Sequence, residues 1–321
     1  MQEQKMSGKQ NRTATLRSVA LKKKLSRAKR YYQLYILMII PVGLLVIFKY
    51  VPMVGILLAF KSYTYADGFF GSPWNHFAHF KRLFSDPLFT RALLNTLRLS
   101  LLQIIFGFPM PIVFALLLNE VQNAKYKRTV QTISYLPHFL SWVIVGSFVY
   151  QLLSTEVGLF NIIRRALGLE TFYYMGSKAA FTPIYIITNV WKSIGWSSVI
   201  YLASLSSVDP QLYEAAAIDG ANRFRKAIHV SIPGILPVVT IQFILALGGI
   251  LNQSYDAIMN LAGQRLLSVS DVLATFSYRA GLIDNRFDYA TAISLFQNVV
   301  GFVLILIVNS FIRRVNEYAL W

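Results

Sequence analysis

Cysteine is absent from the chain, so disulfides and thiol chemistry are excluded, and the redox compartment is not indicated. Histidine is scarce, with four residues, and their positions form no obvious ligand set for a metal ion. His76 and His79 lie three residues apart, which is weak evidence for a metal site, and an interfacial role fits them better. We therefore expect no metal site.

Charged residues are also few, because Asp, Glu, Lys and Arg make up 14% of the chain, against about 25% in soluble domains. Hydrophobic residues make up 55% and are gathered in separate long blocks. This composition is typical of a chain surrounded by lipid. The sequence also has no phosphate-binding loop of the Gly-x4-Gly-Lys-Ser/Thr kind and no nucleophile–base pair. We expect the chain neither to hydrolyse ATP itself nor to bind a cofactor.

Acidic residues are outnumbered by basic ones, 14 to 31, which gives a formal net charge of +17. An anionic polymer as cargo would suit this charge, but its position indicates a topology signal and no nucleic-acid partner. The densest basic cluster directly precedes the first apolar block and contains one acid, Glu3. Such clusters mark the cytoplasmic side of a membrane. Its members are Lys5, Lys9, Arg12, Arg17, Lys22, Lys23, Lys24, Arg27, Lys29 and Arg30.

The apolar blocks predict an all-α integral membrane protein with about six transmembrane helices. Each block is long enough to cross about 30 Å of hydrocarbon as a helix. The first continues into further apolar sequence without a cleavage pattern, so we interpret it as an uncleaved span, kinked at Pro41 or Pro52, and not as a signal peptide. The predicted spans cover residues 35–60, 99–118, 134–153, 183–205, 238–259 and 290–311.

With six spans, both termini lie on the same side, and the positive-inside rule places them in the cytoplasm. The predicted organisation is a basic cytoplasmic segment over 1–33, a membrane domain over 34–315 with a cytosolic loop at about 207–236, and a short cytoplasmic end over 316–321. The predicted outside loops, 61–93, 154–182 and 260–289, are rich in aromatic residues. These residues fit the membrane interface or the docking of an external protein, and the sequence does not decide between the two.

The cytosolic loop between the fourth and fifth spans predicts a helix-turn-helix. Asp209 is a good N-cap, and Pro210 suits the first helical position, where no amide donor is needed. A short helix is expected over 212–218, followed by a turn at Asp219-Gly220, where glycine can take a positive φ.

A second short helix is predicted over 221–229, and Pro233 is expected to end it before the next span. Ala215 and Ala216 leave a low surface on the first helix, which allows close approach of a partner. Glu214 offers a charge that can pair with an arginine.

This loop resembles the signature loop of ABC-importer permeases, Glu-Ala-Ala, three residues, Gly, nine residues, Ile-x-Leu-Pro. Val230 and Ile232 replace the usual Ile and Leu. The matching positions are Glu214, Ala215, Ala216, Gly220 and Pro233, and Asp219 and Ala221 fit the commoner extended form with Asp-Gly-Ala.

The resemblance covers nearly the whole chain and is closest to the carbohydrate permeases of the maltose type that import complex or oligomeric sugars. It rests on four further motifs: Pro52-Met53-Val54-Gly55-Ile56, Gly71-Ser72-Pro73-Trp74, Trp191-Lys192-x-x-Gly195-Trp196, and Asn316-Glu317-Tyr318-Ala319-Leu320-Trp321.

The resemblance implies a non-catalytic permease subunit in the bacterial inner membrane, surrounded by lipid. It further implies a heterodimer with a second permease, two ATPase subunits that bind ATP and Mg²⁺, and a periplasmic or extracellular solute-binding protein. The implied cargo is an oligo- or polysaccharide, acidic ones such as alginate included. The implied ATPase-coupling residues are Glu214, Ala215, Ala216, Asp219, Gly220 and Ala221.

Polar and aromatic residues within two predicted spans are candidates for a substrate path, because sugars are held by hydrogen bonds and by stacking on aromatic faces. The alternative is hydrogen bonding between helices that only packs the bundle. For Lys192 both a wet path and pairing with backbone carbonyls of a neighbouring span remain open. The candidates are Asn189, Trp191, Lys192 and Trp196 on the fourth span, and Gln242, Asn252, Gln253 and Tyr255 on the fifth.

Two other functions compete with the importer. A secondary transporter usually carries an acid deep in the membrane, whereas Glu120 and Asp256 lie near the ends of predicted spans. A membrane-embedded glycosyl or lipid transferase needs convergent acids or a metal site, and neither is evident. Both alternatives leave the cytosolic loop unexplained, so the sequence favours the importer.

Overall fold

The computed structural model describes residues 30–315, and these are almost entirely helical. Among them, β pairing is limited to an isolated bridge between Lys61 and Trp74. The predicted all-α class is confirmed. Most of the basic segment predicted over 1–33 and all of the end predicted over 316–321 lie outside the described residues. The chain divides into two compact units, Met1–Leu57 and Leu58–Trp321.

The first unit contains α2 (Tyr32–Leu45), a π-helical turn, η1 (Val46–Tyr50), and most of a 3-10 segment, η2 (Val51–Phe60), which ends in the second unit. Together they form one helix of 29 residues that is long and apolar enough to cross a membrane, and this agrees with the predicted first span. The hydrogen-bonding pattern changes near Pro52, which has no amide donor. No residue of α2 is buried.

The second unit begins with α3 (Gly68–Gly71) and α4 (Ala78–Ser85), followed by the continuous helix of α5 (Pro87–Leu102), η3 (Gln103–Gly107) and α6 (Pro109–Asn119). The predicted span starting at residue 99 therefore begins too late. The Asp86 carboxylate accepts a hydrogen bond from the Leu88 amide at 2.9 Å and caps the helix start. The first turns of α5 carry polar residues such as Asn95, so the sequence before residue 99 is less apolar and was left out of the predicted span. The structure nevertheless buries Asn95.

The third predicted span, 134–153, is broken. It consists of α7 (Ala124–Tyr135), the 3-10 turn η4 (Leu136–Phe139) and α8 (Trp142–Leu152), and the two helices meet at 103°. Pro137 lies inside the 3-10 turn, and the Ser141 hydroxyl accepts a hydrogen bond from the Ile144 amide and starts α8. Proline and a new N-cap thus divide an apolar block that hydropathy alone joins.

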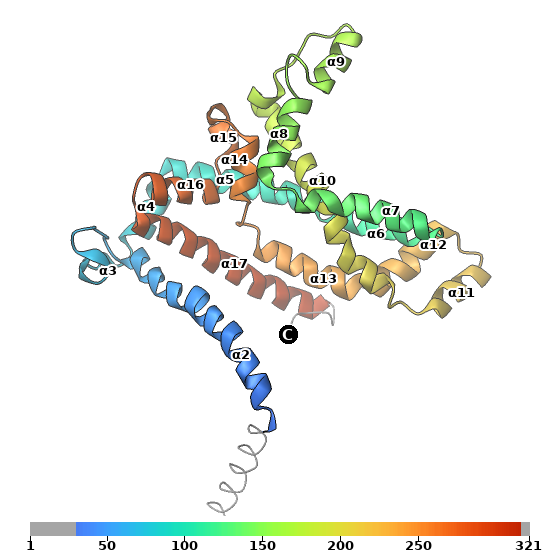
Figure 1. Ribbon diagram of the computed structural model, residues 1–321, viewed down its shortest axis with the longest axis horizontal. Coiled ribbons are helices and arrows are strands. Elements are labelled where there is room, and N and C mark those ends of the chain that lie inside the picture. Colours follow the sequence, from blue (N-terminus) through green and yellow to red (C-terminus); the bar gives the residue numbers. More distant parts are fainter. Residues whose placement is uncertain (1–29, 316–321) are drawn as a thin grey trace, which may run out of the picture. The chain divides into compact units, whose positions relative to one another are not determined.

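The fourth predicted span lies within α10 (Lys178–Leu205), which has 28 residues and a length of about 42 Å at 1.5 Å per residue. It is preceded by α9 (Leu159–Ala166) and the turn η5 (Tyr174–Gly176). In the second unit, α10 packs along α6 and against the broken third span. In Figure 1, α10 runs from the region of α8 to the loop that holds α11.

The loop after α10 forms α11 (Pro210–Ile218), α12 (Arg223–Lys226), the π turn η6 (Ala227–Ser231) and α13 (Ile232–Gly248). The prediction that Pro233 ends the second loop helix is wrong, because residues Arg223–Gly248 form one helix. The Ile232 amide bonds to the Ala227 carbonyl, five residues back. This wider turn lets the helix accommodate the proline ring.

The fifth predicted span, 238–259, is wrong at both ends. The helix starts at Arg223 and ends at Gly248, and Gly249 is its C-cap. A non-helical segment follows before α14 (Tyr255–Leu261). Asn252 and Gln253 therefore lie in a break between helices and not along a span. Gly248 and Gly249 are poor helix formers, and the helix ends at this pair.

The predicted outside loop 260–289 is largely helical, with η7 (Gln264–Leu266), α15 (Leu267–Ser270), α16 (Leu273–Tyr278) and η8 (Arg279–Ile283) before α17 (Phe287–Val315). In Figure 1, α17 runs beside α13, and the two are in contact. The main core lies where α4, α5 and α16 meet α17. It contains Leu83, Phe89, Leu273, Phe276, Tyr289 and Ile293.

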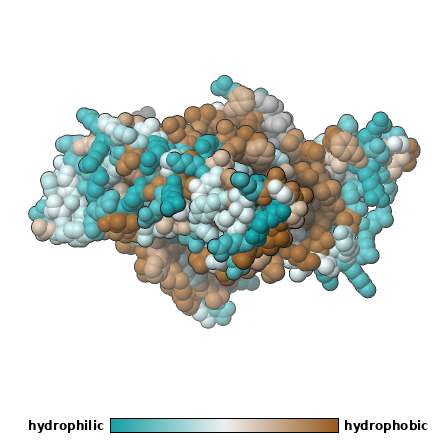
Figure 2. Space-filling model, turned by 90° about the horizontal axis from the view of Figure 1, so that it is seen from above, coloured by the Kyte–Doolittle hydropathy of each residue, from teal (hydrophilic) through white to brown (hydrophobic). Residues whose placement is uncertain are grey.

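Within the described residues, four helices are long and apolar enough to cross a membrane, or five if the bent pair is one span. They are Tyr32–Phe60, Pro87–Asn119, Arg223–Gly248 and Phe287–Arg314. Figure 2 shows apolar residues over much of the middle of one face and hydrophilic residues toward its two ends. The predicted number of six spans remains a prediction.

Candidate functional site

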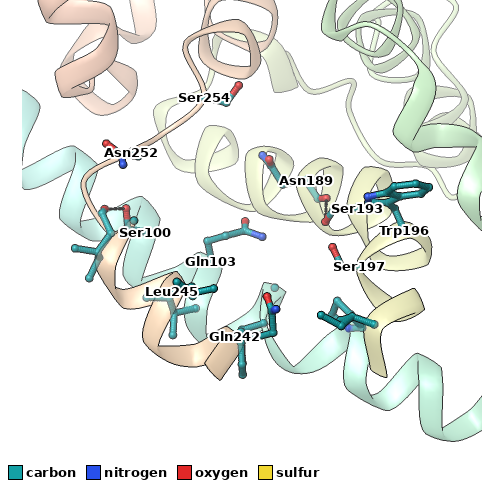
Figure 3. Close-up of a pocket in the computed structure, with 18 of the residues that line it drawn as sticks. Ser100, Gln103, Asn189, Ser193, Trp196, Ser197, Gln242, Leu245, Asn252 and Ser254 are labelled. Atoms are coloured by element: carbon teal, nitrogen blue, oxygen red, sulfur yellow. Dashed lines mark hydrogen bonds between the residues drawn. The ribbon is translucent and has the colours of Figure 1, made fainter. Parts of the chain in front are cut away.

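The second unit contains an open cavity of about 880 Å³ whose walls come from α5, η3, α6, α10, α13 and the break after α13 (Figure 3). Amides and hydroxyls dominate its polar lining, and Tyr185, Trp196 and Tyr201 add aromatic surface. None of the residues that line it is Asp, Glu, Lys, Arg or His. The polar lining residues are Ser100, Gln103, Asn189, Ser193, Ser197, Gln242, Asn252, Gln253 and Ser254.

Gln253 ties three walls of the cavity together. Its amide nitrogen donates to the Ser100 hydroxyl at 2.6 Å, and its amide oxygen accepts from the Tyr185 hydroxyl at 2.6 Å. The Ser100 hydroxyl in turn donates to the Ile250 carbonyl. This chain of hydrogen bonds links α5, α10 and the break after α13. It satisfies the polar groups of a non-helical segment that lies next to apolar helices.

Trp196 presents an aromatic face on the α10 side of the cavity (Figure 3). Its indole stacks on the His138 ring, with the centroids 4.8 Å apart and the planes 8° apart. Phe139 meets the same indole edge-on at 5.5 Å. The side chain of Trp196 remains 47% exposed, so a bound molecule can reach it. Flat aromatic surface of this kind suits the apolar face of a sugar ring.

The first helix of the loop after α10 and the turn that follows it have the geometry that their sequence predicts. The Asp209 carboxylate accepts from the Gln211 amide at 2.9 Å and caps α11. At the other end Gly220 has φ +74°, and the Ala221 amide donates to the Ala216 carbonyl at 2.8 Å. This is a Schellman ending, which requires a left-handed residue at the position of Gly220.

Figure 1 shows α11 and α12 at the far end of the loop, which exposes apolar side chains. Ile218 and Phe224 are 87% and 72% exposed, and Glu214 is exposed beside them on α11. A hydrogen bond connects α11 to the residue before α13, because the Tyr213 hydroxyl lies 2.9 Å from the Ser231 hydroxyl. This bond joins α11 to the start of the helix whose later residues, Gln242 and Leu245 among them, line the cavity.

Comparison with known proteins identifies the family. Residues 107–317 match the family described as "Binding-protein-dependent transport system inner membrane component". The chain belongs to this family. It is a membrane component of a transport system and not an enzyme.

Among curated proteins, the permease is similar to the polygalacturonan/rhamnogalacturonan transport system permease protein YteP of Bacillus subtilis (strain 168). The two are 39% identical over 302 residues, which cover 94% of each chain.

Two solved structures are also similar to the permease. One is a bacterial ABC transporter involved in the import of the acidic polysaccharide alginate, and the other is a bacterial alginate ABC transporter in complex with an alginate pentasaccharide-bound periplasmic protein. Each match has a TM-score of 0.83 and 39% identity, and covers 92% of this chain and 99% of the other.

The permease brings five of the eight predicted path residues to the cavity lining: Asn189, Trp196, Gln242, Asn252 and Gln253. Trp191 and Tyr255 are not among the lining residues. Trp191 is 43% exposed elsewhere on α10, and Tyr255 begins α14 and packs against Tyr278 with ring centroids 4.5 Å apart. The sequence analysis missed Ser100 and Gln103, although polar residues within a predicted apolar span were the signal that could have found them.

Lys192 also lies outside the cavity lining. Its ammonium donates to the carbonyls of Pro137, His138 and Leu140 at 3.2, 2.8 and 2.7 Å. Of the two possibilities that the sequence left open, the structure supports pairing with backbone carbonyls of the neighbouring span.

Proposed function

We propose that the permease is one transmembrane subunit of an ATP-driven importer and forms part of the path for an oligo- or polysaccharide. The observation that carries this proposal is the cavity of about 880 Å³, lined by amides, hydroxyls and the Trp196 face and by no ionic side chain. Hydrogen-bonding groups beside aromatic surface are what a sugar chain requires. The substrates named for YteP and for the alginate transporter support a polysaccharide cargo, acidic ones included.

The proposed partners are a second permease, two ATPase subunits and an external solute-binding protein. The family description and the alginate transporter that was solved with its periplasmic protein support this assembly. ATP and Mg²⁺ would bind to the ATPase subunits, since the sequence of the permease has no phosphate-binding loop of its own.

The proposed topology has six spans, with α10 and the bent pair α7–α8 added to the four long apolar helices. The basic residues of α12 (Arg223, Arg225, Lys226) and the pair Arg313 and Arg314 near the end of α17 would then face the cytoplasm. Residues 1–33 and 316–321 would be cytoplasmic segments flanking the permease domain of the inner membrane.

In the proposed mechanism, the exposed surface of α11 and α12 docks on an ATPase subunit. Closure of the ATPase dimer on ATP moves this loop, and the Tyr213–Ser231 bond passes the movement to α13, which lines the cavity. Alternating access then follows as a shift between two arrangements, and ATP hydrolysis resets the transporter. The coupling residues are Glu214, Ala215, Ala216, Asp219, Gly220 and Ala221.

The assembled complex tests this function. The permease is co-purified with its second permease and ATPase subunits, and ATP hydrolysis is measured with the binding protein and a panel of oligosaccharides from alginate, polygalacturonan and rhamnogalacturonan. We expect stimulation by at least one sugar and none by free histidine, which serves as a non-sugar solute. Failure to co-purify with an ATPase, or stimulation by the amino acid alone, would contradict the proposal.

A further inference from the structure

At the break in the third span, the Pro137 carbonyl accepts from the Leu140 amide at 3.2 Å, whereas the carbonyls of His138 and Leu140 meet no backbone donor in the described part of the chain. Residues Leu136–Phe139 form a 3-10 turn, and α8 starts anew at Trp142. The last carbonyls of a helix have no partner within it, and a backbone polar group left unpaired away from water is strongly unfavourable. The break therefore needs donors from another element.

Lys192 supplies these donors from α10. An ammonium group has three N–H donors and no acceptor, and its three carbonyl partners, at Pro137, His138 and Leu140, are 52 to 55 residues away in sequence. The same ammonium lies 5.5 Å from the ring centre of Trp142, the first residue of α8. One side chain thus contacts both sides of the break.

Trp196 contacts the same break and also lines the cavity. It follows Lys192 by one helical turn on α10. Trp196 stacks on His138 and meets Phe139, both of which lie in the 3-10 turn that Lys192 holds. Between them, at Gly195, α10 approaches the Ser134 carbonyl so closely that a side chain would collide with it. Lys192, Gly195 and Trp196 therefore face the third span together.

We propose that Lys192 is a positioning residue for transport, which clamps the break between α7 and α8 and thereby holds the Trp196 face in the cavity wall. Lys192 is not a ligand for the cargo, since its donors are used by the carbonyls and it does not line the cavity. The effect on transport rests on the proposed function; the clamp itself does not.

The experiment compares Lys192→Met, which keeps the length of the side chain and removes its donors, with Lys192→Arg, which keeps charge and donors. Lys178→Met on the exposed start of the same helix is the matched control. Amide hydrogen exchange is measured over residues 136–145 in the purified complex. We expect exchange at least about tenfold faster in Lys192→Met, because hydrogen bonds to a charged group are lost. Lys192→Arg retains most of the protection, and Lys178→Met exchanges like the wild type.

Uptake separates positioning from binding. Lys192→Met should lower uptake of neutral and acidic sugars by the same factor, and should add little in a Trp196→Ala background, since both changes act on one wall. Loss confined to acidic sugars would make Lys192 a cargo ligand and overturn the proposal. Unchanged hydrogen exchange would also overturn it.

Two further results are interpretable. If Lys192→Met does not assemble, Lys192→Gln, which keeps two amide donors, replaces it, and intermediate protection is expected; protection equal to that of the wild type would contradict the clamp. If the wild-type complex imports no sugar, the proposed function fails, while the exchange result still decides whether Lys192 holds the break.

Discussion

The guanidinium of Arg279 lies 2.7 Å from the carboxylate of Asp271, whose side chain is completely buried. Thr275 donates its hydroxyl to the same carboxylate at 2.8 Å, and Arg91 approaches it to 3.8 Å. The backbone carbonyl of Asp271 accepts from the Asn95 amide at 3.0 Å. This network ties α5 to the helices between α14 and α17.

Removal of the buried carboxylate should destabilise the permease. Asp271→Ala leaves Arg279, whose side chain is 30% exposed, without its carboxylate partner, and we expect a loss of about 1–3 kcal/mol. The measurement is thermal unfolding of the purified protein in detergent. Asp284→Ala, an exposed acid of the same region, is the control and should unfold like the wild type. Equal unfolding of both variants would show that the network does not hold these helices.

The absence of cysteine makes the topology directly testable, because single cysteines can be introduced without background labelling. Position 285, to be changed from Asn to Cys, lies in the exposed turn before α17. Position 224, to be changed from Phe to Cys, lies in α12, in the coupling loop formed by residues 207–231. In intact cells a membrane-impermeant maleimide should label position 285 and not position 224, and both should react after the membrane is permeabilised. Labelling of position 224 in intact cells would place the coupling loop outside.

Features encoded by neighbouring residues could be predicted from the sequence. The N-cap at Asp209, the proline that follows it and the turn at Gly220 all act within a few residues, and the structure has each of them as expected. The first span was found in the same way, since length and apolarity suffice where a helix is uninterrupted.

Breaks and long-range contacts could not be predicted. Apolarity reflects transfer into lipid and does not indicate where a helix ends. The predicted span 134–153 therefore runs across the break at Pro137, and the predicted span 238–259 runs across the break after Gly248. Pro233 failed as a stop because a π turn accommodates it. The bond from Gln253 to Ser100 spans 153 residues, and no local pattern encodes such a pair.

Two tryptophans on α10 allow a residue that lines the cavity to be compared with one that does not. Trp196 lines the cavity and Trp191 does not, although the sequence made both candidates. Trp196→Ala should reduce uptake by up to about tenfold, since contact with an aromatic face contributes about 0.5–1.5 kcal/mol, with assembly and basal ATPase activity retained. Trp191→Ala should leave uptake near the wild-type rate. Equal effects of the two changes would mean that Trp196 contributes packing and no contact with the cargo.

Gly220 and Gly168 form a matched pair for testing the coupling loop. Both follow a short helix in a Schellman ending, with φ +74° and +71°, and a Cβ atom at either position would have no other group within 4 Å. Valine at either position should therefore add only backbone strain of about 1–2 kcal/mol, and both variants should reach the membrane in normal amounts. Of the two substitutions, only Gly220→Val changes the direction in which the chain enters α12. It should lose sugar-stimulated ATP hydrolysis, whereas Gly168→Val should retain it.

Glu214→Arg tests the same contact by charge instead of geometry. Glu214 is exposed on α11 and makes no bond within the described part of the chain that its reversal would break, so folding should be unaffected. The carboxylate of Glu214 is suited to pair with a basic group of the ATPase subunit. An arginine at the same position would repel that group. The variant should therefore lose the ATPase subunit on purification, while Gly220→Val keeps the subunit and loses its stimulation. Normal transport by both variants would remove α11 and the turn after it from the coupling path.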